Sequence, residues 1–291
     1  MNSQDRSNIR VLVTGSKGQL GQCIKLASAN FINLELVFTN SKEFDITNNE
    51  SISSFLKENH FDYVINCAAY TNVEKAEKES QKAFLINAEG TKNIAEACKV
   101  NDVRLIHIST DYVFDGNKNT PYIENDIPNP INEYGKSKLK GEQYIQEILK
   151  KYFIIRTSWL YSEFGNNFFK TIIKKSRTEK KLSIITSETG SPTNANDLAE
   201  FVLEIIRSKV DKYGIYHFSN EGEATWYDFA KEIIYNLGKV DTIKLEKIDN
   251  YPTFAKRPDY SVLNKKKSME SFSLNILNWK DSLKKLQSNT R

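Results

Sequence analysis

Three side chains of this sequence have the types and the spacing of a site that could protonate a ketone oxygen. Tyr134 and Lys138 lie four residues apart where a helix is expected to begin, so the phenol and the ammonium share one helix face. Thr110 closes an apolar run further upstream, where a strand would deliver its hydroxyl into a cleft. A hydroxyl, a phenol and an ammonium that converge on one point suit proton transfer to a carbonyl. Thr110, Tyr134 and Lys138 are therefore the candidate catalytic residues.

A ketone reduction also needs a hydride donor, and the beginning of the chain has the pattern of a dinucleotide-binding turn. The β-branched run 9–14 stops at Gly15, and apolar residues recur at helical spacing after Leu20. Glycines in such a turn let the backbone approach a pyrophosphate, which the positive end of the helix favours. The spacing is G-x-x-G-x-x-G rather than G-x-G-x-x-G, and the P-loop pattern is absent. The predicted cofactor contacts here are Gly15, Ser16, Lys17, Gly18, Gln19 and Leu20.

The end of the second predicted strand, residues 34–38, bears on the choice of cofactor. An acidic residue there normally binds the ribose 2′-hydroxyl of NADH, whereas a basic residue suits the 2′-phosphate of NADPH. No acidic residue closes the strand, while Lys17 and Lys42 lie nearby, so NADPH is predicted and NADH remains the alternative. Asp45 and Ile46 are candidate adenine contacts. Asp45 could equally cap the helix that follows.

The strands and helices that must position these side chains alternate through five units. A third strand over 62–70 ends in the small residues Ala68 and Ala69, beside Tyr70, where a flat cofactor could lie against the backbone. A helix over 81–100 carries Asn87 in its apolar stripe, and this buried amide needs a partner. We include all four in the predicted cofactor site.

The fourth strand leads to Thr110, the next helix runs over about 134–151, and a fifth strand covers 152–157. This alternation predicts an α/β fold with a Rossmann-like, doubly wound parallel sheet, whose ligands bind beyond the carboxyl ends of the strands. Beyond Trp159 the pattern loosens. Helical spacing predicts helices over 167–175, 199–206, 226–237 and 279–286, and short apolar runs predict strands over 182–185 and 213–218. We expect residues 1–159 and about 194–225 to form the dinucleotide-binding domain, and about 160–193 and 226–291 a smaller α/β substrate domain.

Composition argues against several other classes of protein. The chain has 291 residues and a net charge of +4, spread without a basic stripe, so nucleic-acid binding is not expected. No apolar run approaches the ~20 residues that span a membrane, and no signal peptide is recognisable. Cys23, Cys67 and Cys98 lack ligand-like spacing, which fits a reducing cytoplasm. The histidines are isolated, so no metal site is predicted, and His107 is interpreted as a core residue.

Taken together and in order, the motifs resemble the extended short-chain dehydrogenase/reductase superfamily. They are VTGSKGQLG, NCAAYTNVEKAE, INAEGT, STDYVFDG, YGKSKLKGE, RTSWLY, GNNF, GSPT and KRPDYS. The resemblance implies reduction of the 4-keto group of a dTDP-sugar by a reduced nicotinamide. In that scheme Tyr134 protonates the ketone oxygen, Lys138 lowers the tyrosine's pKa and binds the nicotinamide ribose, and Thr110 holds the carbonyl.

The same resemblance implies the substrate contacts. Trp159 would line the sugar pocket, Thr193 would shape it, and Arg257 would grip the pyrophosphate with its guanidinium. The full predicted set is Thr110, Asp111, Val113, Tyr134, Trp159, Asn167, Thr193 and Arg257. Some relatives carry an acidic residue for a metal-linked dimer contact where this chain has Cys23. That difference argues against both the metal and the metal-linked dimer, and a homodimer of another kind stays an alternative.

Two other functions compete with a reductase. Nucleotide-sugar 4,6-dehydratases and 4-epimerases share the threonine, tyrosine and lysine, but a dehydratase usually has an Asp-Glu pair after the threonine. Here Tyr112 follows Asp111, so that acid is missing. A non-catalytic regulatory subunit of the same fold would be favoured by loss of the tyrosine or the lysine, and both are present. The sequence therefore predicts an NAD(P)H-dependent reductase.

Overall fold

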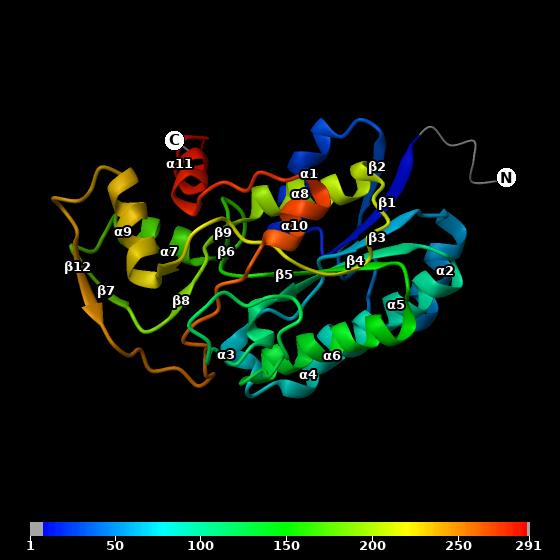
Figure 1. Cartoon of the computed structure of the whole chain (residues 1–291), viewed down its shortest axis with the longest axis horizontal. Coiled ribbons are helices and arrows are strands. Elements are labelled where there is room, and N and C mark those ends of the chain that lie inside the picture. The colour runs from blue at the N-terminus through cyan, green and yellow to red at the C-terminus, as the bar shows by residue number, and fades with distance from the viewer. Residues whose placement is uncertain (1–7, 290–291) are drawn as a thin grey trace.

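A six-stranded parallel sheet forms the centre of the molecule, which the computed structural model describes over residues 8–289 (Figure 1). Its strand order is β10-β5-β4-β3-β1-β2, and every neighbouring pair is parallel. The strands are β1 (Ile9–Thr14), β2 (Leu34–Phe38), β3 (Tyr63–Asn66), β4 (Arg104–Thr110), β5 (Tyr152–Thr157) and β10 (Gly214–His217). The chain places β2 on one side of β1 and β3, β4, β5 and β10 on the other, so the strand order reverses between β1 and β3, as in doubly wound folds. The predicted fold class is confirmed.

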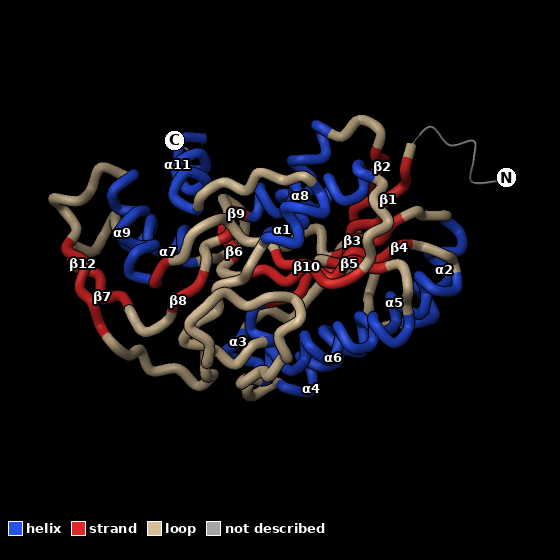
Figure 2. Tube along the Cα trace, in the orientation of Figure 1, coloured by secondary structure: helices blue, strands red, loops and turns tan. Residues whose placement is uncertain are grey.

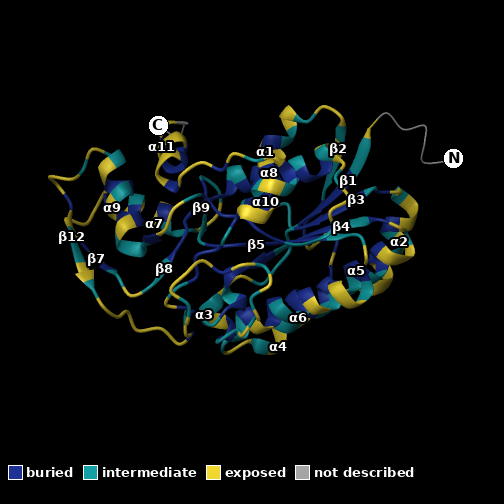
Figure 3. Cartoon of the chain, in the orientation of Figure 1, coloured by how far each residue is buried: buried dark blue, intermediate teal, exposed yellow. Residues whose placement is uncertain are grey.

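Helices cover both faces of this sheet, because alternate strand residues point to opposite sides. Val11 and Val13 pack toward α1 (Gln19–Ala27), α8 (Ala195–Ser208) and α10 (Lys266–Phe272). Leu12 and Val64 pack toward α2 (Asn49–Asn59), α5 (Gly90–Val100) and α6 (Glu133–Ile148). Figure 2 shows α1 and α8 on one side of the strands and α5 and α6 on the other, and Figure 3 shows β4 and β5 largely buried between them. The central strands of the sheet are thus covered on both faces, whereas the edge strand β2 has no buried residue and exposes Glu35.

The long helix expected over 81–100 is interrupted. It consists of α4 (Ser80–Phe84), a π-helical turn at Leu85–Glu89 and α5. Asn87 lies in that turn, where its side chain accepts from the Tyr70 amide and donates to the Tyr70 carbonyl and to Ser137. The buried amide therefore has the partners that its position required. Gly141 permits the close approach of α6, since a Cβ there would lie 2.3 Å from the Asn87 carbonyl oxygen.

A second group of elements has its own apolar core beside the sheet. Phe169, Leu182, Phe229 and Leu283 are among its buried members. The elements are α7 (Phe168–Lys175), α9 (Trp226–Asn236), α11 (Trp279–Asn289) and the parallel pair β7 (Lys181–Ile185) and β12 (Lys244–Ile248). The sequence predicted these elements except β12. In contrast, α10 packs against α8 and β10 of the main sheet.

Short strands join the two groups. They are β6 (Leu160–Tyr161), β8 (Thr189–Gly190), β9 (Thr193–Asn194) and β11 (Ala224–Thr225), in the pairs β6–β9 and β8–β11. The short helix α3 (Val73–Ala76) follows β3, and two short 3₁₀ helices lie at Ser28–Asn30 and Asp111–Val113. Within residues 8–289 no helix combines the length and apolarity needed to span a bilayer.

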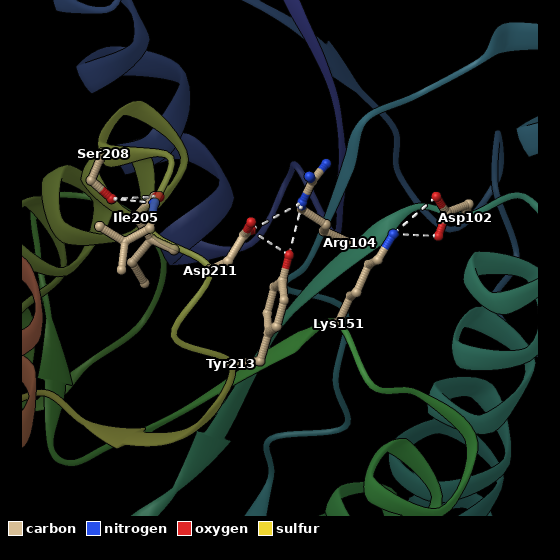
Figure 4. Close-up of polar contacts among 8 residues, drawn as sticks. Asp102, Arg104, Lys151, Ile205, Ser208, Asp211 and Tyr213 are labelled. Carbon is tan, nitrogen blue, oxygen red and sulfur yellow. Dashed lines mark hydrogen bonds and ion pairs between the residues drawn. The ribbon is translucent and has the colours of Figure 1, made fainter.

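The amino-terminal edge of the sheet is closed by exposed polar pairs (Figure 4). Lys151, just before β5, donates to Asp102 at 2.7 Å. Arg104, at the start of β4, donates to the Tyr213 phenol at 3.1 Å, and that phenol donates to Asp211. Every side chain of this group has a polar partner, and each is at least partly in contact with solvent.

Candidate active site

A cleft with a volume of about 380 Å³ opens at the opposite, carboxyl-terminal edge of the sheet. The three predicted catalytic residues, Thr110, Tyr134 and Lys138, all line it. Its other walls are Gln19, Leu20, Cys67, Ala69, Thr71, Val73, Ile108, Ser109, Asp111, Tyr112, Thr157, Ser158, Trp159, Leu160, Asn166 and Trp226. The cleft thus lies where the parallel-sheet rule places a ligand.

The residues that follow β4 pack closely against the start of α6, and this contact places Thr110 and Tyr134 in the same cleft. Thr110 ends the strand and caps the following turn by accepting the Tyr112 amide at 3.1 Å. Asn132 caps α6 by accepting the Gly135 amide at 2.7 Å. A Cβ on Gly135 would lie 2.2 Å from the Tyr112 carbonyl oxygen, so glycine is required for this approach.

The Tyr134 side chain is half-buried in the cleft, and desolvation of its phenol raises its pKa to about 12. The hydrogen bond with Thr110 opposes this rise, and the nearby Asp111 carboxylate adds to it. The expectation that Lys138 lowers the tyrosine's pKa is therefore wrong for this structure. The physical reason is the direction of the lysine, which donates to the Ile108 carbonyl at 2.7 Å and contacts His107.

Lys138 belongs to a buried polar chain that crosses the sheet. Its Nζ lies 3.1 Å from His107 Nε2, and His107 Nδ1 lies 3.1 Å from the side-chain nitrogen Nδ2 of Asn66. Thr14 donates to Asn66 at 2.7 Å. Burial lowers the pKa of Lys138 to about 8, against the opposing influence of Glu142. His107 is a buried residue, as predicted, but its contact with the lysine was not foreseen.

Burial and the Lys138 charge hold the pKa of His107 well below its usual range, so the imidazole is neutral. A neutral imidazole has one donor and one acceptor nitrogen. The chain therefore fixes the ring between strand and helix and holds the lysine beside the cleft.

The glycine turn has the geometry of a pyrophosphate cradle. Gly15 has φ +65°, and a Cβ there would lie 2.7 Å from the Ala68 amide nitrogen. A Cβ on Gly21 would lie 2.6 Å from the Gly15 carbonyl oxygen, so this glycine lets α1 approach the turn. Gly18 caps α1 without a side-chain hydrogen bond, which leaves amides of the first helical turn available to an anion. Ser16 and Lys17 extend the turn, and Gln19 and Leu20 reach the cleft.

The end of β2 differs from the prediction in two respects. Asp45 accepts from the Thr47 amide and hydroxyl, whereas Asn48 caps α2, so the suggestion that Asp45 caps this helix is wrong. A carboxylate does lie at the strand end, because Glu43 folds back and accepts from the Asn40 amide at 3.0 Å. The Asn-x-x-Glu spacing, similar to that of a capping box, is the sequence signal that could have revealed it.

Two stacked tryptophans form the wall of the cleft toward the second group of elements. The rings of Trp159 and Trp226 have centroids 3.6 Å apart and planes inclined by 4°. Trp159 adopts φ +45°, and its ring packs over Gly190. Trp226 donates from its indole nitrogen to Glu188 at 2.8 Å. The sequence indicated Trp226 only as the start of a helix, since nothing local marks it as a neighbour of Trp159.

Several predicted site residues do not line the cleft. Val113 and Thr193 are fully buried. Asn167 caps α7 and donates to Gln19 at 2.6 Å, which ties the second group of elements to the glycine turn. Arg257 is paired with Glu74 at 2.6 Å. Of the predicted cofactor contacts, Ala69 lines the cleft, whereas Ile46, Ala68, Tyr70 and Asn87 lie outside its lining.

The thiols and acidic groups give no sign of a metal centre. Within residues 8–289 no cluster of three histidine, cysteine or acidic side chains could hold a metal ion. Cys23 is buried in the packing of α1, and burial raises the pKa of its thiol to about 12.

The chain is similar to known proteins over almost its whole length. Residues 9–291 match the family model described as RmlD substrate binding domain. The dTDP-4-dehydrorhamnose reductase of Aggregatibacter actinomycetemcomitans is 36% identical, over 96% of this chain and 98% of the relative.

Solved structures agree with that match. A dTDP-4-dehydrorhamnose reductase from Clostridium acetobutylicum has a TM-score of 0.92 and 39% identity, covering 97% of this chain and 99% of the other. A dTDP-4-dehydrorhamnose reductase from Bacillus anthracis, solved in complex with NADP, has the same TM-score, 36% identity and the same coverage.

Proposed function

This chain belongs to the dTDP-4-dehydrorhamnose reductase family, and we propose that it reduces the 4-keto group of dTDP-4-dehydro-L-rhamnose to give dTDP-L-rhamnose. This is the last step of dTDP-rhamnose synthesis. One observation carries the proposal: Thr110, Tyr134 and Lys138 meet in a single cleft at the carboxyl edge of the sheet. Tyr112 stands after Asp111, where a dehydratase would need its glutamate.

NADPH, when bound, supplies the hydride for carbon 4 of the sugar. The residues of the glycine turn fit such a cofactor, since Gly15 and Gly21 lack the Cβ atoms that would clash with the Ala68 and Gly15 backbone and so keep the turn close to the sheet and to α1. Ser16, Lys17, Gly18, Gln19 and Leu20 would hold the pyrophosphate end, with the start of α1 contributing backbone amides. Lys17 and Lys42 favour the 2′-phosphate of NADPH, whereas the carboxylate of Glu43 is the feature that would favour NADH.

The chain's own groups supply the proton and the orientation. Tyr134, with its pKa raised to about 12, holds its proton at neutral pH and gives it to the ketone oxygen as negative charge develops there. Thr110 donates a hydrogen bond to the same oxygen. Lys138 stands within the cleft and is the group that would bind the nicotinamide ribose.

Ala69 and Trp159 line the cleft, whereas Arg257 lies outside its lining. Ala69 and the stacked Trp159 are suited to the nicotinamide and the sugar, respectively, because flat apolar surfaces pack against both. Arg257 would bind the pyrophosphate of the nucleotide sugar by exchanging its partner Glu74 for phosphate oxygens.

The other predicted contacts retain their proposed roles. Asp45, Ile46, Ala68, Tyr70 and Asn87 would support the cofactor, and Asp111, Val113, Asn167 and Thr193 would support the substrate. We also retain the proposed division into a dinucleotide-binding domain (1–159 and about 194–225) and a substrate domain (about 160–193 and 226–291), except that α10 packs with the former. We place the reaction in the cytoplasm, where the three cysteines remain thiols.

An absorbance assay tests the function directly. The purified protein is mixed with dTDP-4-dehydro-L-rhamnose and either NADPH or NADH, and the reduced-nicotinamide band is followed. Consumption of NADPH that requires the sugar is the expected result, with slower consumption of NADH. No consumption of either cofactor would refute the proposed reaction. Sedimentation of the same sample would decide between a monomer and the homodimer that the sequence leaves open.

A further inference from the structure

The hydroxyl of Thr110 can donate only one hydrogen bond, and in this structure that bond goes to its neighbour. Thr110 Oγ1 donates to Asp111 Oδ1 at 3.0 Å and accepts from the Tyr112 amide at 3.1 Å. A hydroxyl has one proton and two lone pairs. The second lone pair faces the cleft that Tyr134 also lines, and an interaction with Thr110 lowers the pKa of the Tyr134 phenol.

In the proposed reaction Thr110 has to donate a hydrogen bond to the ketone oxygen, but its single proton is already donated to Asp111. An ionised carboxylate only accepts hydrogen bonds. While Asp111 is ionised, the single Thr110 proton is directed to it and is not available to the ketone oxygen. A neutral carboxylic acid can reverse the bond by donating its own proton to the Thr110 oxygen.

We propose that Asp111 is a positioning residue that must be a neutral carboxylic acid for ketone reduction, because only then does Thr110 donate to the substrate oxygen. The inference rests on the proposed function. When substrate binds, the Tyr134 phenol turns to the ketone and vacates one lone pair of Thr110. Asp111 then donates into that lone pair, the Tyr112 amide keeps the other, and the Thr110 proton faces the substrate. Asp111 keeps its proton throughout, so the reorientation consumes none.

The surroundings of Asp111 suit a carboxyl group that is neutral for part of the time. The side chain is 2% exposed, and Oδ2 has no hydrogen bond of standard geometry within the described residues. Burial raises its pKa to about 7, although the hydroxyls of Ser261 and Thr110 favour the charged form. Both forms are therefore populated near neutral pH.

The titratable neighbours of Asp111 are the phenols of Tyr112 and Tyr134, whose pKa values its charge raises. The charges of Arg257 and Glu188 act on the same Tyr112 phenol. Lys138, on α6, directs its amine to the Ile108 carbonyl and His107. Both phenols stay protonated around neutral pH, whereas Asp111, with a pKa of about 7, and Lys138, with a pKa of about 8, change charge there.

The test is the dependence of kcat on pH for the wild type and for Asp111→Asn. In the wild type, kcat should fall as the pH rises through about 7, by up to tenfold per pH unit. Asparagine can donate to Thr110 at any pH, so the variant should not show this fall in kcat. Its kcat should change with pH only near 8, where Lys138 loses its proton. The same fall near 7 in Asp111→Asn would overturn the proposal.

Two further variants separate positioning from a structural role. Ser261→Ala removes a hydroxyl that favours the carboxylate, so the fall should move to higher pH. Thr110→Val has no hydroxyl to redirect, so it should lack the fall, and adding Asp111→Asn to it should change kcat by less than about twofold. A fall that stays at the same pH in Ser261→Ala, or persists in Thr110→Val, would contradict the proposal even if Asp111→Asn failed to fold.

Infrared spectroscopy of the protein without substrate gives an independent readout. The wild type at pH 6 should show a carbonyl band of a protonated carboxyl group that weakens by pH 8 and is absent from Asp111→Asn. A wild type that reduces the ketone but lacks this band would refute the inference alone. A wild type that shows the band but reduces no ketone would refute the proposed function instead.

Discussion

The two ends of the central sheet contain the same kinds of side chain, but these side chains differ in solvent contact and in how completely they are hydrogen-bonded. At the amino-terminal edge the Tyr213 phenol is bonded to Arg104 and Asp211, partly in water. At the carboxyl-terminal edge the Tyr134 phenol is desolvated within the cleft and lies near the fully buried Asp111, whose second oxygen has no hydrogen bond of standard geometry among residues 8–289. Residue type therefore does not distinguish a reactive edge from a structural one. Burial with incomplete pairing does, because it leaves protons that can be redirected.

The ion pairs of the two edges differ in the same way. The Arg156–Glu142 pair, at the carboxyl edge, is 2% and 0% exposed and also accepts a hydrogen bond from Ser109. The Lys151–Asp102 pair, at the amino edge, is 43% and 80% exposed. The buried pair holds Ser109, which lines the cleft, through a hydrogen bond to Glu142, whereas the exposed pair only joins two loops. The following substitutions, ordered by expected effect, test this difference.

Removal of the phenol oxygen should have the largest effect, and at one edge only. Tyr134→Phe should lower kcat by roughly 10³- to 10⁴-fold, because no other acid replaces the phenol. Tyr213→Phe is the matched control and should leave kcat within about twofold, since the oxygen it removes is bonded only to Asp211 and Arg104. Steady-state rates with saturating NADPH and sugar measure both. Similar rates for the two variants would show that the Tyr134 phenol is no more important for the reaction than the Tyr213 phenol.

Loss of one ion-pair partner should distinguish the edges in stability. Glu142→Gln should lower the free energy of unfolding by about 3–5 kcal/mol, because it leaves Arg156 buried and unpaired. Asp102→Asn should lower it by no more than about 1 kcal/mol, since the pair is exposed. Urea unfolding at one pH gives both values. Equal losses would mean that burial does not separate the two pairs.

Removal of the Thr110 hydroxyl should weaken the reaction less than removal of the phenol. Thr110→Val should raise the activation free energy by about 2–4 kcal/mol, the usual contribution of one donor to a developing oxyanion. Thr110→Ser retains the donor and should recover most of that loss. The measurement is kcat/KM for the sugar. A serine variant as slow as the valine variant would show that the hydroxyl is not what matters.

A Cβ in the glycine turn should have the smallest effect of this series, mainly on cofactor affinity. Gly15→Ala adds a strained φ and a contact 2.7 Å from the Ala68 amide, and should cost about 1–3 kcal/mol. Gly238→Ala shares a φ of +68° but has no atom within 4 Å of the added Cβ. NADPH titration by fluorescence should therefore show weaker binding for Gly15→Ala alone. An unchanged NADPH affinity in Gly15→Ala would show that the glycine turn does not contact the cofactor.

Much of the fold could be predicted because its signals are local. The β-branched runs of β1, β2, β4 and β5 and their glycine or polar ends predicted the strands and the carboxyl edge where Thr110 lies. The helical spacing from Tyr134 to Lys138 predicted their shared face.

What the sequence did not predict depends on contacts between distant segments. The direction of Lys138 toward His107, the stacking of Trp226 on Trp159 and the partner of Arg257 all require the folded chain. The pKa of Tyr134 was predicted in the wrong direction because desolvation depends on burial in three dimensions. The π turn around Asn87 likewise follows from the packing of α6.

Transfer of a labelled hydride tests the central claim most directly. The protein is incubated with dTDP-4-dehydro-L-rhamnose and NADPH that carries deuterium at the transferable position, and the sugar product is examined by NMR and mass spectrometry. We predict one deuterium on carbon 4 of the sugar and a reduced hydroxyl at that carbon. A product without deuterium at carbon 4, or NADPH that is not consumed, would contradict the assignment of the carboxyl edge as a ketone-reducing site.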